Sequence, residues 1–76
     1  MRRLTYRIVL REEPEGGYTV TVPSLPGCIT YGKDINDSYV MAREAILAYI
    51  ESQMKHGDPI IDDSQTFEGV VNLEYA

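Results

Sequence analysis

Only a few side chains in this 76-residue sequence could take part in catalysis. His56 is the one histidine, so any imidazole base or metal ligand must be this residue. It falls at the expected end of a helix, where a positive charge is favoured, and this position explains it without catalysis. Cys28 follows a turn and has no histidine near it in sequence to activate a thiolate. A small buried hydrophobic residue is favoured over a nucleophile.

Acidic residues gather in one short loop after the expected helix: Asp58, Asp62 and Asp63. A calcium loop places oxygen ligands at alternate positions around a glycine, and this loop has neither feature. It is interpreted as a solvated acidic loop. Ser24 and Ser38 have no partners of a catalytic triad. The sequence therefore predicts no enzyme, no metal site and no cofactor.

Two surface features could bind a partner. Arginines alternate along one face of the first predicted strand: Arg3, Arg7 and Arg11. We favour a solvated sheet face for this arginine stripe, and an interface is the alternative. Apolar residues recur every seven positions on one flank of the predicted helix: Val40, Leu47 and Met54. This helix flank is either the edge of a broad core or a contact surface for a dimer or a partner, and both remain open.

Four predicted strands and one helix must position these side chains. Apolar and polar residues alternate strictly over residues 4–11, which is typical of a half-buried strand. Residues 18–22 and 28–31 are rich in strand-forming residues, and residues 67–75 alternate again as a fourth strand. From residue 35 to about 56 the apolar period becomes that of a helix whose apolar stripe covers the sheet.

Turn and capping residues mark the boundaries of these elements. Pro26 and Gly27 have the conformational preferences of the two central positions of a tight turn. Asp34 is the expected N-cap of the helix, and Gly57 and Pro59 are the expected stop. The order is β-β-β-α-β, an α+β fold in one domain, residues 1–76. A right-handed crossover through the helix predicts an antiparallel meander with the sheet order 3-2-1-4.

Composition excludes several classes of protein. Seven lysines and arginines against twelve acidic residues give a net charge of -5, the wrong sign for neutralising phosphates. A basic partner is the more natural one. A single cysteine cannot form an internal disulfide, and no apolar run approaches the length of a membrane span. We expect a cytoplasmic protein that binds no membrane.

The sequence resembles the HicB-like antitoxin family. The resemblance rests on Tyr-Thr-Val-Thr-Val-Pro-Ser-Leu-Pro-Gly-Cys over residues 18–28, on Gly32, and on the helix start at residues 34–37 with Ala-Arg-Glu-Ala-Ile at residues 42–46. It covers about residues 4–60. It implies a β-β-β-α-β fold likened to a partial RNase H fold. No carboxylates for magnesium lie on the first three predicted strands, so the likeness implies no nuclease activity.

The same resemblance implies a type II antitoxin that covers the active site of HicA, a small basic toxin that cleaves mRNA. Members of the family commonly form dimers or tetramers, so a homodimer or higher homo-oligomer is expected. Many members carry a further C-terminal DNA-binding segment, whereas this chain stops at Ala76, as a short form would. Direct DNA binding is therefore not expected. The alternative function is an orphan oligomeric module of this fold without a toxin partner.

Overall fold

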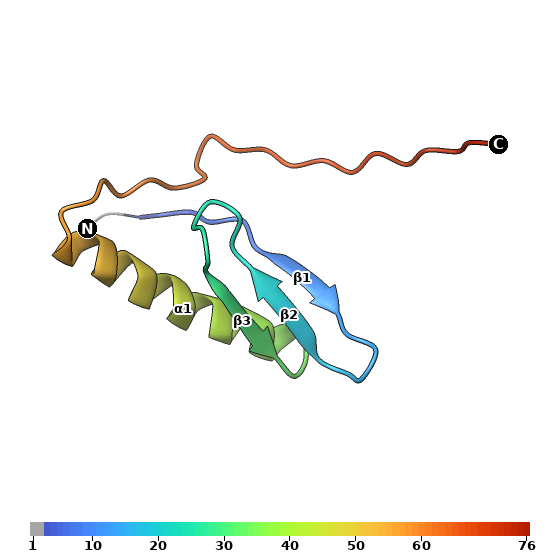
Figure 1. Cartoon of the computed structure of the whole chain (residues 1–76), viewed down its shortest axis with the longest axis horizontal. Helices are drawn as coiled ribbons and strands as arrows, with labels where there is room; N and C mark the ends of the chain where they lie inside the picture. The colour runs from blue at the N-terminus through green and yellow to red at the C-terminus, as the bar shows by residue number, and fades with distance from the viewer. Residues whose placement is uncertain (1–2) are drawn as a thin grey trace.

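The computed structural model describes residues 3–76, and the predicted α+β class is confirmed. In this part of the chain, three strands precede one helix (Figure 1). The elements are β1 (Val9–Glu12), β2 (Tyr18–Thr21), β3 (Ile29–Gly32) and α1 (Ile35–Lys55). The strands form one antiparallel sheet in the order β1-β2-β3, and α1 packs on one of its faces.

Hairpin register places alternate residues of the strands on opposite faces of the sheet. Val9 pairs with Thr21, which pairs in turn with Ile29. Val20 is fully buried on the inner face, under the helix. The turn that connects β2 to β3 forms as predicted, because Gly27 adopts a φ of 82°, which side chains with a Cβ rarely accept.

The ends of α1 also agree with the sequence. Asp34 is the N-cap, and its side chain accepts a hydrogen bond from the Asp37 amide at 2.7 Å. The Asp37 side chain in turn accepts from the Lys33 amide at 2.9 Å, one residue before the N-cap amide that a capping box uses. His56 is the C-cap, and its Nδ1 lies 2.8 Å from the Ser52 carbonyl. The helix is thus stabilised at both ends by side chains within a few residues.

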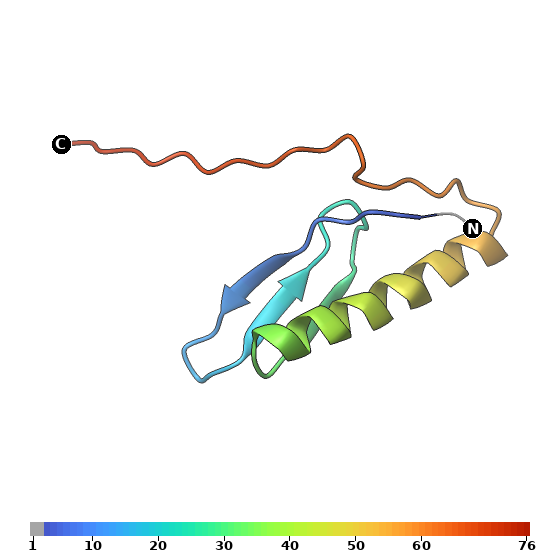
Figure 2. The same cartoon turned by 180° about the vertical axis from the view of Figure 1, so that it is seen from behind.

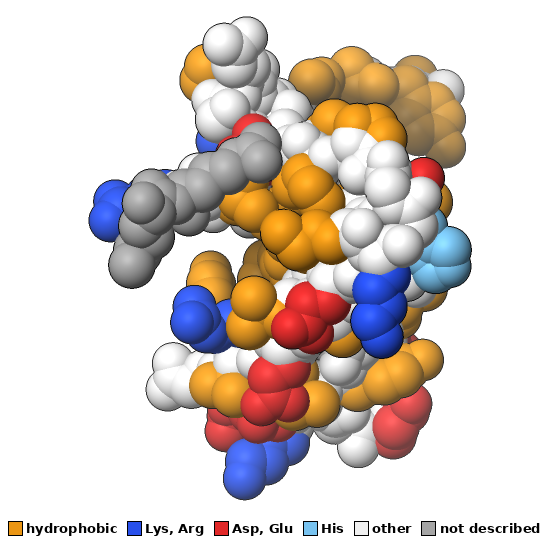
Figure 3. Space-filling view, turned by 90° about the vertical axis from the view of Figure 1, so that its left-hand side faces the viewer, with side chains coloured by type: hydrophobic (Ala, Val, Ile, Leu, Met, Phe, Trp, Pro, Cys, Tyr) orange, Lys and Arg blue, Asp and Glu red, His pale blue; other side chains and the backbone are white. Residues whose placement is uncertain are grey.

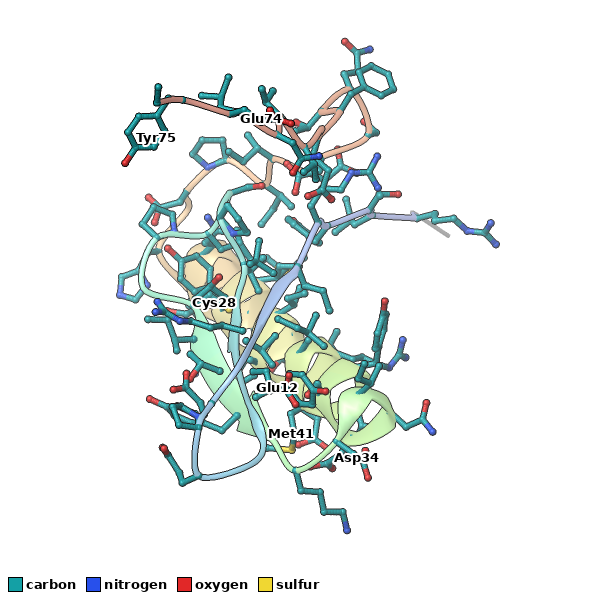
Figure 4. The ribbon with its side chains drawn as sticks, turned by 90° about the vertical axis from the view of Figure 1, so that its right-hand side faces the viewer. Glu12, Cys28, Asp34, Met41, Glu74 and Tyr75 are labelled. Carbon is teal, nitrogen blue, oxygen red and sulfur yellow. The ribbon has the colours of Figure 1, made fainter. Side chains whose placement is uncertain are left out.

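The helix contacts β3 most extensively and β2 less, and within residues 3–76 it makes no comparable contact with β1. Its first turn approaches β3 so closely that a Cβ built on Gly32 would lie 2.2 Å from Ser38 Oγ. Ser38 is fully buried at this contact. Between the layers lies the core, formed by Val20, Val22, Leu25, Cys28, Ala42 and Ile50. Figure 4 shows Cys28 in this position between sheet and helix.

The first predicted strand is shorter than its alternating pattern. β1 begins at Val9, not at residue 4, because the register places residues 4–8 opposite the turn that follows β2. After Val9 and Thr21, the next hydrogen-bonded pair between the two strands would be Arg7 with Pro23, which has no amide hydrogen to donate. Backbone pairing by β2 therefore ends at Thr21.

The predicted fourth strand is absent from residues 3–76 of the single chain, so the order 3-2-1-4 is corrected to a three-stranded sheet. We define residues 67–76 as the C-terminal tail. The tail is exposed throughout and extends past the sheet toward the right in Figure 1. A strand needs a partner for its backbone groups, and the tail runs past β1 without pairing with it.

Candidate interaction surfaces

The loop after α1 binds residues 5–7 through two aspartates, which we call the acidic clasp: Asp62 and Asp63. An Asp62 carboxylate oxygen accepts from the Thr5 amide at 2.9 Å. Asp63 accepts from the Arg7 amide at 2.8 Å and from the Ser24 hydroxyl, while its own amide donates to the Thr5 carbonyl at 2.7 Å. The clasp thus takes the place that β2 leaves open beside residues 5–7.

Asp63 is only 4% exposed, so the interpretation of this loop as fully solvated is wrong for Asp63. Hydrogen bonds from the Ser24 hydroxyl, then from the Arg7 amide, lower the pKa of Asp63 below its ordinary value. These donors satisfy a carboxylate that would be costly to bury without partners. The only signal in the sequence is the pair of isoleucines before the aspartates, of which Ile60 is half-buried.

Cys28 and His56, the two candidate catalytic residues, both lie where packing or helix capping accounts for them. Burial raises the pKa of the Cys28 thiol, which disfavours the reactive thiolate. His56 lies exposed at the end of α1, where its ring contacts a carbonyl of the last helical turn. Both positions agree with the structural interpretation favoured from the sequence.

The arginine stripe is divided between different environments. Arg7 is half-buried, and its Nη2 and Nε donate to the Thr66 carbonyl at 3.0 and 3.3 Å. This contact holds the chain against the outer face of the sheet immediately before the tail begins. Arg3 and Arg11 are exposed on either side of it.

The helix flank is not the edge of the core. Val40 is 54% exposed, Leu47 50% and Met54 66%. Of these, Leu47 also lines a groove that the sequence did not predict. The flank is thus available for contact, and its use as an interface stays a prediction.

This groove of about 530 Å³ runs between α1 and the N-terminal part of the chain. It forms because α1 covers β3 and β2 and leaves the inner side of residues 4–8 open. Its walls are formed by Arg3, Leu4, Tyr6, Ile8, Tyr39, Ala42, Arg43, Ile46, Leu47 and Ile50. Figure 3 shows hydrophobic side chains gathered around a hollow at this end of the molecule.

The outer face of the sheet is a second apolar surface that we did not predict. Ile29 and Tyr31 of β3 are exposed by 53% and 66%. The register extends them across the sheet in two rows, Ile29 with Thr21 and Val9, and Tyr31 with Thr19 and Arg11. The signal was present in the sequence, since Cys28 and Thr30 alternate with Ile29 and Tyr31 and only one set can face the core.

The family model for HicB-like antitoxins of bacterial toxin-antitoxin systems matches residues 6–76. The UPF0150 protein Ta0767 of Thermoplasma acidophilum is 41% identical over 61 residues, covering 80% of this chain and 88% of that protein. A UPF0150 protein of Archaeoglobus fulgidus is 40% identical over 48 residues, covering 63% of this chain and 70% of that protein.

A UPF0150 protein of Synechocystis is 34% identical over 55 residues, covering 72% of this chain and 70% of that protein. UPF0150 proteins are members of the same family. Within residues 3–76, the helix is not apolar enough to cross a membrane. The match extends through the three strands, the helix, the acidic clasp and the tail. The chain therefore belongs to the HicB-like antitoxin family of bacterial toxin-antitoxin systems.

Proposed function

We propose that the protein is a cytoplasmic antitoxin that binds a small basic HicA-type ribonuclease toxin and covers its active site. The observation that carries this proposal is the exposed outer face of the sheet, where Ile29 and Tyr31 leave apolar surface in water. Exposed apolar side chains bordered by charges are typical of protein-protein contact surfaces. A contact of this kind needs no catalytic group on the antitoxin.

Negative charge at one end of the sheet supports a basic partner, although the outer face itself carries Arg11 in the row of Tyr31. Acidic residues gather at the end of the molecule where the β1-β2 hairpin and the β3-α1 connection lie together, and Figure 4 shows Glu12 and Asp34 there. Glu12, Glu15 and Asp34 are exposed, whereas Glu13 accepts a hydrogen bond from Thr19. The net charge of -5 adds a long-range attraction for a basic toxin.

The orphan oligomeric module stays as a second candidate, because the helix flank is an exposed apolar surface that a second copy could cover as well as a toxin. The partial RNase H likeness also stays a prediction from the resemblance. The same holds for the expectation that the chain is no enzyme and needs no cofactor.

Co-expression with any small basic protein encoded beside this chain tests the proposal. We expect a complex that survives purification at low salt and relieves growth arrest by the toxin. Failure of the two proteins to co-purify, together with unrelieved toxicity, would refute the antitoxin function and leave the orphan module.

A matched pair of variants identifies the contact surface. Ile29 and Val40 have almost equal exposure, 53% and 54%, but lie on the outer sheet face and on the helix flank. Ile29→Glu should abolish co-purification, because a buried carboxylate without a partner is costly, while Val40→Glu should leave it intact. The reverse result would assign toxin binding to the helix flank.

A further inference from the structure

The tail carries more exposed apolar surface than any other segment between residues 3 and 76. The side chains of Phe67, Val71, Leu73 and Tyr75 are between 83% and 96% exposed. They alternate with Glu68, Val70, Asn72 and Glu74, so a strand made of this segment would have one strongly apolar face. Such a segment needs a sheet edge for its backbone and an apolar site for this face.

The edge of β1 opposite β2 offers the backbone partner. Successive residues of a strand direct their N–H and C=O groups to opposite edges. The Arg7 amide donates a hydrogen bond to Asp63 of the clasp. The Glu13 amide donates one to the Gly17 carbonyl at 3.0 Å, which continues the ladder toward β2. These odd-numbered residues therefore face the β2 side, and the even-numbered Ile8 and Leu10 face the other edge. No strand of residues 3–76 pairs along that edge.

The groove offers the apolar site beside the same edge. Leu4 and Ile8 line it from the strand side, and Ile46 and Ile50 line it from the helix side. The edge from residue 4 to residue 10 spans about 23 Å, and the nine residues 67–75 span about 30 Å when extended. The tail is thus long enough to cover the whole edge.

The tail of the same chain does not start where it could enter this groove. Thr66 is held by the Arg7 guanidinium, and Arg7 shares the outer side of the strand with Val9 and Arg11. The groove lies on the inner side, toward α1. Figures 1 and 2 both show the tail running past residues 3–8 on the side away from α1. Figure 4 likewise places Glu74 and Tyr75 far from Met41 on the helix.

We propose that residues 67–75 of one copy form a strand beside residues 4–10 of a second copy, on the edge opposite β2, and fill its groove with Val71 and Leu73. In a two-fold dimer each chain gives its tail and receives one, so both sheets become four-stranded. The tail's charges fit this arrangement. With the apolar set facing the groove, Glu68 and Glu74 point to the outer face, where the arginine stripe of β1 lies.

Two neighbouring valines test this proposal. Val71 and Val70 are 83% and 87% exposed in the single chain, so a glutamate at either position leaves the monomer's core untouched. Sedimentation should show a wild-type dimer. Val71→Glu should weaken it at least ~100-fold, because its carboxylate would enter the apolar groove, whereas Val70→Glu should change it little. A chain lacking residues 67–76 should be monomeric and folded by circular dichroism.

Cross-linking separates exchange between copies from insertion within one chain. Leu47→Cys places a thiol on the groove wall and Leu73→Cys places one on the tail, while the buried Cys28 should stay unmodified. Two differently tagged single variants, mixed and treated with a short bismaleimide, should give a heterodimer.

A monomeric wild type would overturn the proposal. So would a cross-link that forms only within a single chain carrying both Leu47→Cys and Leu73→Cys, and not between the two single variants. Equal weakening by Val70→Glu and Val71→Glu would overturn it as well. These outcomes do not depend on toxin binding, because no toxin is present in the assay.

Discussion

Removal of the Asp63 carboxylate should strongly destabilise the fold, although the residue lies in a loop. Asp63 accepts hydrogen bonds from the Arg7 amide and the Ser24 hydroxyl in a site where only 4% of the residue is exposed. Hydrogen bonds to a charged group contribute roughly 1.5–3 kcal/mol each. The two share one carboxylate and are not additive, so we expect Asp63→Ala to cost about 3 kcal/mol.

That cost is a large part of the stability of a domain of this size. At roughly 0.05–0.15 kcal/mol per residue, 76 residues correspond to about 4–11 kcal/mol. A loss of about 3 kcal/mol should lower the Tm by roughly 12–24 °C. Asp63→Asn should cost less free energy. The oxygen of its side-chain amide can still accept from the Arg7 amide, and its NH2 group can donate to the Ser24 hydroxyl oxygen.

Urea and thermal unfolding followed by circular dichroism measure these differences. Asp58→Ala is the matched control, since Asp58 is an exposed aspartate of the same loop. Because the full-length chain is expected to dimerise through its tail, the chain lacking residues 67–76 serves as the monomeric background for all variants. A change below about 0.5 kcal/mol for Asp63→Ala, no larger than that for Asp58→Ala, would refute the role of the clasp.

The same carboxylate should make stability depend on pH. Folding lowers the pKa of Asp63 below its ordinary value of 3.8, so the ionised form stabilises the native state above that pH. This contribution should disappear as the pH falls below about 4 and through the folded pKa. Asp63→Asn should remove that part of the acid sensitivity. Equal acid dependence of wild type and Asp63→Asn would contradict the assignment.

Four further predictions address the core, the flank and the surface charge. Gly32→Ala should destabilise by about 1–3 kcal/mol in urea unfolding, because the added Cβ would meet Ser38 and its backbone; a neutral result would refute the close contact. Cys28 should react with a thiol reagent only at the rate of unfolding, because it is buried and its pKa is raised; rapid labelling would contradict this. Leu47→Glu should keep the fold, since the residue is half exposed, and should lower the mass measured by light scattering; an unfolded variant would place Leu47 in the core. The isolated protein should give no sequence-specific shift of its promoter DNA at physiological salt, because its charge is -5.

Local interactions made much of this fold predictable from sequence. Asp34 caps the helix through an amide three residues away, and Gly27 adopts the positive φ that its turn requires. The helix ends within one residue of the expected position, at Lys55. Strands β2 and β3 were found from residue preferences and alternation. In each case the responsible groups lie within a few residues of one another, so the pattern along the chain is sufficient.

Long-range packing decided the rest. Asp62 and Asp63 look like solvent-exposed aspartates in sequence. Only the fold brings Thr5 to Asp62 across 57 residues, and Arg7 and Ser24 to Asp63 across 56 and 39 residues. The helix flank lies at the surface because the helix covers β3 and β2 rather than β1, and this placement is not encoded in the helix's own pattern. Alternation in residues 67–75 shows that a strand can form, but a strand exists only where another backbone accepts it. The clasp fixes the side of residues 5–7 from which the tail starts, and so decides which sheet edge the tail can reach. Only the tertiary structure determines this position.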